Sequence, residues 1–336
     1  MKSLVVRLDS FGDVLLAGPA VRAVAARSSH VTLLCGPRGA DAARLLPGVD
    51  EVLVWEAPWE GFDPPPVRPA DIDGLVGRLR AGAYDTALVL TSFHQSPLPT
   101  ALLLRLAGVG RIGADSVDHP GRLLDVRHRR LAGRHEAEAA LDTAAALGFP
   151  APPGDDGRLR VLPPPDTGSL TGNGPYVVLH PGASAPARAW SPHRCAEAVA
   201  LLTDAGHRVV VTGGPEETGL TREVSGGLAV DLGGRTSPRT LAGVLRMADV
   251  VISANTGPAH LAAAVGTPVV SLFAPVVPAE RWAPYGVPVI LLGDQSAPCA
   301  DTRALTCPVP GHPCLDEVTG QDVVRAVHKL IQERQP

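Results

Sequence analysis

The feature that most constrains the fold is an alternation of short apolar runs with longer amphipathic stretches, which occurs twice along the 336-residue chain. Such alternation is typical of strands joined by crossover helices, and it predicts parallel sheets covered by helices on both faces. In the first series, we expect strands near residues 3–8, 30–35, 51–54, 85–91 and 109–113. The helices of this series are expected near residues 13–28, 38–46, 71–82, 97–107 and 134–147.

A connection rich in proline and glycine, residues 150–175, separates the first series from the second. The second series predicts strands near residues 176–180, 208–212, 228–232, 249–253, 268–273 and 288–292. Its helices are expected near residues 192–205, 216–225, 238–247 and 257–265. Two doubly wound α/β domains facing a central cleft, residues 1–160 and 161–320, account for this pattern and for the chain length. A last helix within 321–336 could return to the first domain, and segments 56–69 and 115–130 are expected to be surface loops.

Composition limits the partners of the chain. A formal net charge of -4 gives no overall attraction to nucleic acid or to an anionic membrane, so phosphate would have to be bound at local sites. The sequence contains no stretch of about 18 uncharged apolar residues and no evident signal peptide, so we expect no transmembrane segment and a cytoplasmic location. Cysteines at 299, 307 and 314 lack the Cys-x-x-Cys spacing of common zinc sites, and we expect structural thiols and no metal.

Residues 253–264 join an apolar strand to a helix through the residue types that an anion site requires. Thr256 can cap the helix through its hydroxyl, Gly257 permits close backbone approach, and Pro258 suits the first turn. The unpaired N–H groups of that turn and the helix dipole favour phosphate, and His260 can add a side-chain donor. An ordinary turn with a buried, satisfied histidine would have the same sequence, so this segment alone leaves both interpretations open.

Two earlier loops of the second domain could also contact a nucleotide. The first contains the turn Gly182, Ala183 and Ser184. Arg188 follows it and could pair with phosphate oxygens, although a solvated surface arginine would fit equally well. In the second loop, Glu216 and Glu217 follow a glycine pair, and either carboxylate could accept hydrogen bonds from ribose hydroxyls or simply favour the helix dipole.

The loop after the first strand is Asp9-Ser10-Phe11-Gly12-Asp13. It has neither the G-x-G-x-x-G spacing of a dinucleotide-binding fold nor the Gly-Lys-Ser/Thr ending of a P-loop, so it supports neither a nicotinamide dehydrogenase nor an NTPase. The loop places Asp13 at a helix start beside Gly12, a position that suits a general base. The alternative is structural: Asp13 would only complement the helix dipole while Asp9 caps the helix.

Taken in order, these loops resemble glycosyltransferase family 9, the ADP-heptose:lipopolysaccharide heptosyltransferases and their relatives. The matching motifs cover nearly the whole chain: Ser10 to Asp13, His180 to Ser184, Arg188-x-Trp190, Thr212 to Glu216, and Asn255 to Ala262. The resemblance implies a GT-B fold of two Rossmann-like domains and an inverting sugar transfer that uses neither a metal nor a cofactor. It implies a nucleotide-sugar donor, with ADP-heptose expected, and a glycan or small-molecule acceptor bound by loops of the first domain.

The resemblance also assigns roles to individual residues. Asp13 matches the catalytic base. The donor-binding set would be Gly12, Gly182, Ala183, Ser184, Arg188, Glu216 or Glu217, Asn255, Thr256, Gly257, Pro258 and His260. Asn255 replaces an aspartate that is common in the family, which keeps hydrogen bonding and removes a charge. A GT-B-like nucleotide-sugar epimerase and a catalytically silent nucleotide-sugar-binding protein remain as alternatives.

Overall fold

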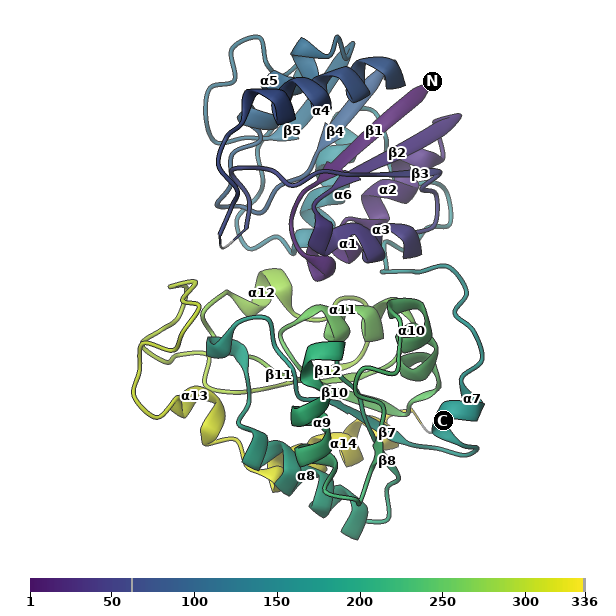
Figure 1. The fold of residues 1–336 in the computed structure, drawn as a ribbon, viewed down its shortest axis with the longest axis vertical. Helices are drawn as coiled ribbons and strands as arrows, with labels where there is room; N and C mark the ends of the chain where they lie inside the picture. Colours follow the sequence, from purple (N-terminus) through teal and green to yellow (C-terminus); the bar gives the residue numbers. More distant parts are fainter. Residues whose placement is uncertain (62, 335–336) are drawn as a thin grey trace. The chain divides into compact units, whose positions relative to one another are not determined.

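The computed structural model describes residues 1–61 and 63–334. It divides into two compact units, Met1–Leu162 and Pro163–Pro336 (Figure 1). The boundary follows residue 162, whereas the sequence predicted it after residue 160. Each unit contains one six-stranded parallel sheet with helices on both faces.

The first unit has the strand order β3-β2-β1-β4-β5-β6. These strands are β1 (Lys2–Arg7), β2 (His30–Cys35), β3 (Glu51–Val54), β4 (Thr86–Val89), β5 (Arg111–Asp115) and β6 (Val126–His128). The order reverses between β1 and β4, so the chain leaves the carboxyl ends of these two adjacent strands toward opposite faces of the sheet. β6 lies inside the segment 115–130 that we expected to be a loop. That expectation is wrong there because a three-residue edge strand with half-buried side chains has no apolar run to reveal it.

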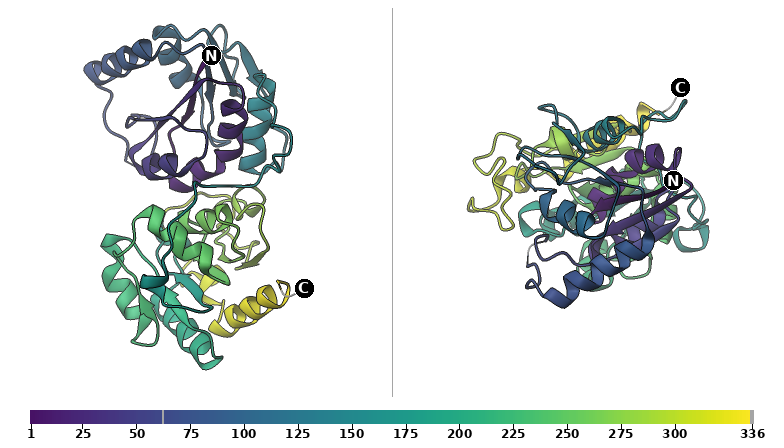
Figure 2. Two further views of the ribbon diagram at one scale, coloured as in Figure 1. Left: turned by 90° about the vertical axis from the view of Figure 1, so that its right-hand side faces the viewer. Right: turned by 90° about the horizontal axis from the view of Figure 1, so that it is seen from above.

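The helices of the first unit are α1 (Phe11–Leu16), α2 (Gly18–Ala25), η1 (Pro37–Gly39), α3 (Ala40–Leu45), α4 (Pro69–Gly82), α5 (Leu98–Leu106) and α6 (Glu136–Ala146). α1, α2, α3 and α6 pack together on one face, whereas α4 and α5 pack on the other (Figure 2, left). The expected helix 13–28 is divided between α1 and α2 at Ala17, because Pro19 lacks an N–H and its ring conflicts with the preceding turn. Segment 56–69 contains no strand and enters α4 only at Pro69; its residue 62 lies outside the described residues.

The second unit repeats this topology with the strand order β12-β11-β10-β7-β8-β9. Its strands are β7 (Val177–His180), β8 (Val209–Val211), β9 (Val230–Asp231), β10 (Val250–Ala254), β11 (Val269–Leu272) and β12 (Val289–Leu292). Here the order reverses between β7 and β10, which pair in parallel. The strands of the sheet centre are buried on both faces, which explains why they read as continuous apolar runs in the sequence.

The helices of the second unit are α7 (Gly168–Thr171), η2 (Pro186–Arg188), α8 (Pro192–Asp204), η3 (Pro215–Glu217), α9 (Thr218–Ser225), α10 (Pro238–Met247), α11 (Gly257–Ala264), α12 (Ala279–Trp282), α13 (Pro313–Asp316) and α14 (Gly320–Gln332). α8, α9 and α14 cover one face, and α10 and α11 the other. α14 buries Val323, Val327 and Leu330 in the core of this unit, beside α8. The last helix therefore does not use its apolar face to return to the first domain; residues 335 and 336 lie outside the described residues.

Candidate active site

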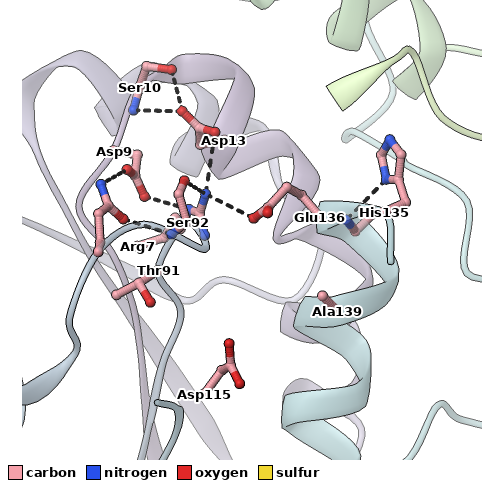
Figure 3. Close-up of polar contacts among 12 residues, drawn as sticks. Arg7, Asp9, Ser10, Asp13, Thr91, Ser92, Asp115, His135, Glu136 and Ala139 are labelled. Carbon is pink, nitrogen blue, oxygen red and sulfur yellow. Dashed lines mark hydrogen bonds and ion pairs between the residues drawn. The ribbon is translucent and has the colours of Figure 1, made fainter. Parts of the chain in front are cut away.

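Arg7 is the centre of a buried polar network at the point where the strand order of the first unit reverses. It ends β1, is 3% exposed, and follows the apolar run Leu4-Val5-Val6. Its Nε lies 2.7 Å from Oδ2 of Asp9, and its Nη2 donates to Oγ of Ser92, just beyond β4, at 2.9 Å (Figure 3). The same Nη2 lies 3.3 Å from Oδ1 of Asp13. One guanidinium therefore joins the loop after β1, the loop after β4 and α1.

Asp13 is held from two sides and remains partly exposed. Its Oδ2 accepts hydrogen bonds from Oγ of Ser10 at 2.6 Å and from the Ser10 N–H at 3.3 Å, while Oδ1 contacts Arg7. Ser10 is the N-cap of α1, so the alternative in which Asp9 caps the helix is wrong. Asp13 does stabilise the helix start, but 18% of its side chain is still exposed. Gly12 is buried within α1 beside it.

Two further acids around Arg7 are fully enclosed. Glu136 begins α6, and its Oε2 lies 3.7 Å from Nη2 of Arg7, while Oε1 pairs with Arg130. Burial raises the pKa of Asp9 and of Glu136, and the positive charge of Arg7 opposes that rise in both cases. Their side chains are 8% and 1% exposed, so Asp13 is the most accessible of the three carboxylates that contact Arg7.

A hydrogen-bonded amide extends this network toward the segment after β3. Nε2 of Gln95 lies 2.5 Å from Oδ1 of Asp9 and 2.6 Å from Oε2 of Glu60. Burial and the neighbouring charge of Asp9 raise the pKa of Glu60 to about 7. Glu60 also lines a cavity of about 190 Å³ together with Arg38 and Glu56. The cavity lies between the loops after β1 and β2 and the expected surface loop 56–69.

Arg7, Glu136 and Gln95 were not predicted from the sequence as members of this network. Arg7 did leave a signal, because a charge that directly follows the apolar run of a buried strand must find partners. Glu136 and Gln95 left none, since an acid in the first turn of a helix and a glutamine in a loop are ordinary at the protein surface.

Beside the corresponding reversal of the second unit, which lies between β7 and β10, the loops after the neighbouring strands β7 and β8 meet around Glu217. The carboxylate accepts a hydrogen bond from the Gly214 N–H at 2.7 Å, and its Oε2 lies 3.9 Å from Nε2 of His180. Nδ1 of His180, at the end of β7, is 3.0 Å from Oγ1 of Thr212, and burial lowers the pKa of the imidazole. A neutral histidine is therefore enclosed between a hydroxyl and a carboxylate.

Glu217 also lies directly over the glycine at the turn after β7. A Cβ on Gly182 would lie 1.9 Å from Oε1 of Glu217, so no other residue fits there without moving the acid. Glu216 is exposed, and Glu217 is the acid that faces this turn. The neighbouring residues become progressively more exposed, with Ala183 half-buried and Ser184 exposed.

Arg188 lies half-buried in η2, and Trp190 just after it is 2% exposed. The indole Nε1 of Trp190 donates to the Leu315 carbonyl at 3.1 Å, so the ring packs under the loop. The tryptophan thereby anchors the short helical turn that carries Arg188.

The start of α11 follows β10 as the sequence predicted. Thr256 is the N-cap residue in an extended conformation, but its side chain makes no capping hydrogen bond, contrary to expectation. Gly257 and Pro258 form the first turn and are half-buried. His260 is 5% exposed in the same helix.

Asn255, which lies between β10 and this turn, is also 5% exposed. Its Nδ2 lies 3.5 Å from the Ala274 carbonyl, and its Oδ1 has no hydrogen-bond partner among the residues described. The turn before α11 therefore presents buried polar groups and backbone N–H groups, with no carboxylate at position 255.

The three late cysteines lie in the core region of the second unit. Cys299 and Cys314 are buried and Cys307 is partly buried. Burial and the neighbouring thiols raise the pKa of Cys314 to about 12. Within residues 1–61 and 63–334, no group of three or more His, Cys, Asp or Glu side chains is arranged to hold a metal ion.

No helix in this described part of the chain is both long and apolar enough to span a membrane.

Comparison with known proteins decides the family. The profile of glycosyltransferase family 9 (heptosyltransferase) matches residues 74–311, well over half of the chain. The chain belongs to glycosyltransferase family 9. Among curated proteins, no significant match was found.

Solved structures of this family confirm the fold of the glycosyltransferase. The Escherichia coli ADP-heptose lipopolysaccharide heptosyltransferase II is 21% identical with a TM-score of 0.76, covering 100% of both chains. A family 9 glycosyltransferase from Veillonella parvula is 18% identical with a TM-score of 0.75, covering 99% of this chain and 97% of its own. The E. coli heptosyltransferase WaaC, solved with ADP, is 20% identical with a TM-score of 0.72, covering 98% and 100%. At these identities the likeness establishes the GT-B fold that we expected.

Proposed function

We propose that this family 9 glycosyltransferase transfers a sugar, heptose from ADP-heptose, to an acceptor hydroxyl with inversion and without a metal or cofactor. The observation that carries the proposal is the state of Asp13, a carboxylate oriented by Ser10 and Arg7 yet still partly exposed at the carboxyl ends of the strands. Ligands of doubly wound sheets bind at that edge. The E. coli relatives, one named for ADP-heptose and one solved with ADP, support the donor.

In the proposed reaction, Asp13 accepts the proton of the acceptor hydroxyl as that oxygen attacks the anomeric carbon. The bond from that carbon to the diphosphate breaks, and the configuration inverts in a single displacement. The proximity of the Arg7 guanidinium favours the ionised form of Asp13, which is the form that a base requires.

The nucleoside diphosphate gains negative charge as it leaves, and we assign its stabilisation to the second unit. The first-turn N–H groups at Gly257, together with His260 and Arg188, supply donors that are fixed before the reaction. Asn255 adds a buried polar group without adding a negative charge beside the diphosphate. We assign the remaining donor contacts to the turns at Gly12, Gly182–Ser184 and Thr256–Pro258.

Of the two candidate acids for the ribose, the structure favours Glu217. Its carboxylate lies over Gly182 and beside His180, whereas Glu216 is exposed. A carboxylate held by the Gly214 N–H keeps further lone pairs with which to accept hydrogen bonds from two ribose hydroxyls. We also propose that the acceptor is a glycan or small molecule met in the cytoplasm, and that no nucleic acid takes part.

Calorimetry with ADP, UDP and GDP tests the donor site directly, and we expect ADP to bind most tightly. ADP-heptose should then release ADP when an acceptor mixture is present, and NMR of the product should show the inverted anomeric configuration. Failure to bind ADP would reject the donor assignment. A new nucleotide sugar formed from the donor alone would indicate an epimerase, and binding without turnover across many acceptors would indicate a silent binding protein.

A further inference from the structure

We infer that Arg7 is a positioning residue for the proposed base: it orients Asp13 and keeps it ionised, while Asp9 and Glu136 hold Arg7 in place. The inference rests on the proposed role of Asp13. It assigns a role in the reaction to three buried residues that do not themselves reach a substrate.

The contacts of Arg7 distinguish its three carboxylate neighbours. Asp9 is held through Nε at 2.7 Å, whereas Asp13 and Glu136 lie 3.3 and 3.7 Å from Nη2 (Figure 3). These acids come from the loop after β1, from α1 and from α6, so the guanidinium is fixed by three separate elements. Nη2 also donates to Ser92 at 2.9 Å. The ion pair of Nε with Asp9 and the hydrogen bond of Nη2 to Ser92 restrict the direction of the fork toward Asp13.

Charge explains why the two enclosed acids are needed. A buried arginine whose only partner was Asp13 would form a tight pair, and that pairing would reduce the basicity of the carboxylate. Asp9 and Glu136 share the positive charge instead, and Arg130 in turn pairs with Glu136. Asp13 thus keeps a long contact to Arg7 and 18% of its side chain exposed. It stays ionised without being neutralised by a short ion pair.

The geometry requires arginine in particular. Arginine presents a planar fork of five donors, whereas lysine presents a single nitrogen on a flexible chain. The single ammonium nitrogen of lysine cannot contact Asp9 on one side and, at the same time, Ser92 and Asp13 on another, as Nε and Nη2 of Arg7 do. We therefore expect Arg7→Lys to restore the charge but only part of the orientation.

A double-mutant cycle tests the inference, with ADP release from ADP-heptose as the assay and water as the acceptor until another is identified. Arg7→Met should lower kcat by about 10- to 100-fold, within the contribution of a positioned base, and leave the ADP dissociation constant unchanged. Arg7→Lys should recover part of that loss. In an Asp13→Asn background, Arg7→Met should lower kcat by a further factor of less than about three. The effects of residues that act through one another are not additive.

The pH profile separates positioning from a merely structural role. Loss of the Arg7 charge should move the acidic limb of the kcat profile to higher pH, because Asp13 loses a neighbour that favours its ionised form. Glu136→Gln removes a counter-charge from Arg7 and should move the same limb to lower pH. This opposite shift also provides the test if Arg7→Met fails to fold. Equal profiles for Arg7→Met, Glu136→Gln and wild type would overturn the inference, as would equal profiles for Glu136→Gln and wild type if Arg7→Met does not fold.

Arg22→Met is the matched control, because Arg22 forms a bidentate ion pair with Asp155 in the same unit, at 2.7 and 2.8 Å. Its kcat and pH profile should equal those of wild type at temperatures where it is folded. A wild-type rate for Asp13→Asn would reject the proposed function itself. A slow Asp13→Asn variant together with a fast Arg7→Met variant would reject only the role of Arg7.

Discussion

The two units share a strand order but place different chemistry where that order reverses. At β1 and β4 of the first unit, the polar groups are charged and pair with one another around Arg7. At β7 and β10 of the second unit, the groups nearest the strand ends are the neutral His180 and Asn255 and the first turn of α11. In the proposed reaction, the first arrangement orients the proton acceptor Asp13, whereas the second presents donors to a ligand that brings its own negative charge. One topology can therefore support two complementary halves of a reaction.

Asp13→Asn should produce the largest effect, and it tests the proposed base in the first unit. The amide keeps a hydrogen-bonding group near Ser10 but cannot accept the acceptor proton. We expect turnover to fall by about 100- to 10,000-fold. ADP affinity should be nearly unchanged, because the groups that we assign to the diphosphate belong to the second unit. Steady-state ADP release and calorimetry measure the two quantities. Asp41→Asn, in the exposed pair with Arg44, is the control and should behave as wild type.

Arg188→Ala tests the proposed phosphate contacts of the second unit. It removes the one cation that we assign to the diphosphate, and a charge-assisted contact of this kind is worth about 1.5–3 kcal/mol. ADP affinity should fall by roughly tenfold or more. Calorimetry at fixed ionic strength is the measurement, with Arg194→Ala as the control, since that arginine pairs with Glu197 on α8. Wild-type affinity for ADP in the Arg188 variant would remove it from the donor site.

Glu216→Gln and Glu217→Gln form a matched pair that sharpens the donor side. Glu217 faces Gly182 and His180, whereas its neighbour is exposed. We expect Glu217→Gln to weaken ADP binding by about tenfold, and Glu216→Gln to have no effect. Binding of 2′-deoxy-ADP provides a second measurement, because the Glu217 variant should discriminate less between the two nucleotides. A larger loss for Glu216 would reverse the assignment.

Asn255→Asp tests whether the second unit depends on the absence of negative charge. A carboxylate at this buried position would lie at the helix start that we assign to the diphosphate, and the two negative charges would repel each other. ADP affinity should fall about three- to fivefold, and the loss should be greater at low salt. Calorimetry at two salt concentrations measures it. Unchanged or tighter binding would show that position 255 does not sense the phosphate charge.

Most of the fold could be predicted because central parallel strands are buried on both faces and are therefore apolar throughout. The exceptions have physical causes. The edge strand Val126–His128 has no apolar run, and Pro19 interrupts an otherwise helical pattern. The packing partner of the amphipathic helix Gly320–Gln332 is a tertiary property, because an apolar stripe does not specify which core it covers.

The candidate site was predictable where a single junction carries it and not where distant segments meet. Asp13, in the first turn of α1, and the turn at Asn255 each lie where the chain passes from a strand to a helix, so local spacing identifies them. The partners of Arg7 come from positions more than a hundred residues apart, such as Asp9 and Glu136. No local pattern relates these positions, and the sheet topology brings them together.

The smallest effect that we expect separates two local regions, one around His207 and one around Asp155, by their response to acid. Burial and the neighbouring His328, whose Nε2 lies 3.0 Å away, lower the pKa of His207 in the second unit. The unfolded chain then binds more protons, so this stability is present above the ordinary pKa of about 6.5 and is lost as pH falls below it. In the first unit, Arg22 lowers the pKa of Asp155 to about 2, so that pair is lost only as pH falls from about 4 toward 2. Hydrogen exchange between pH 7 and 5, corrected for the intrinsic rate, should show loosening around His207 in wild type and less in His207→Gln, with no change around Asp155. Equal loosening in wild type and variant would show that the histidine pair does not cause the difference.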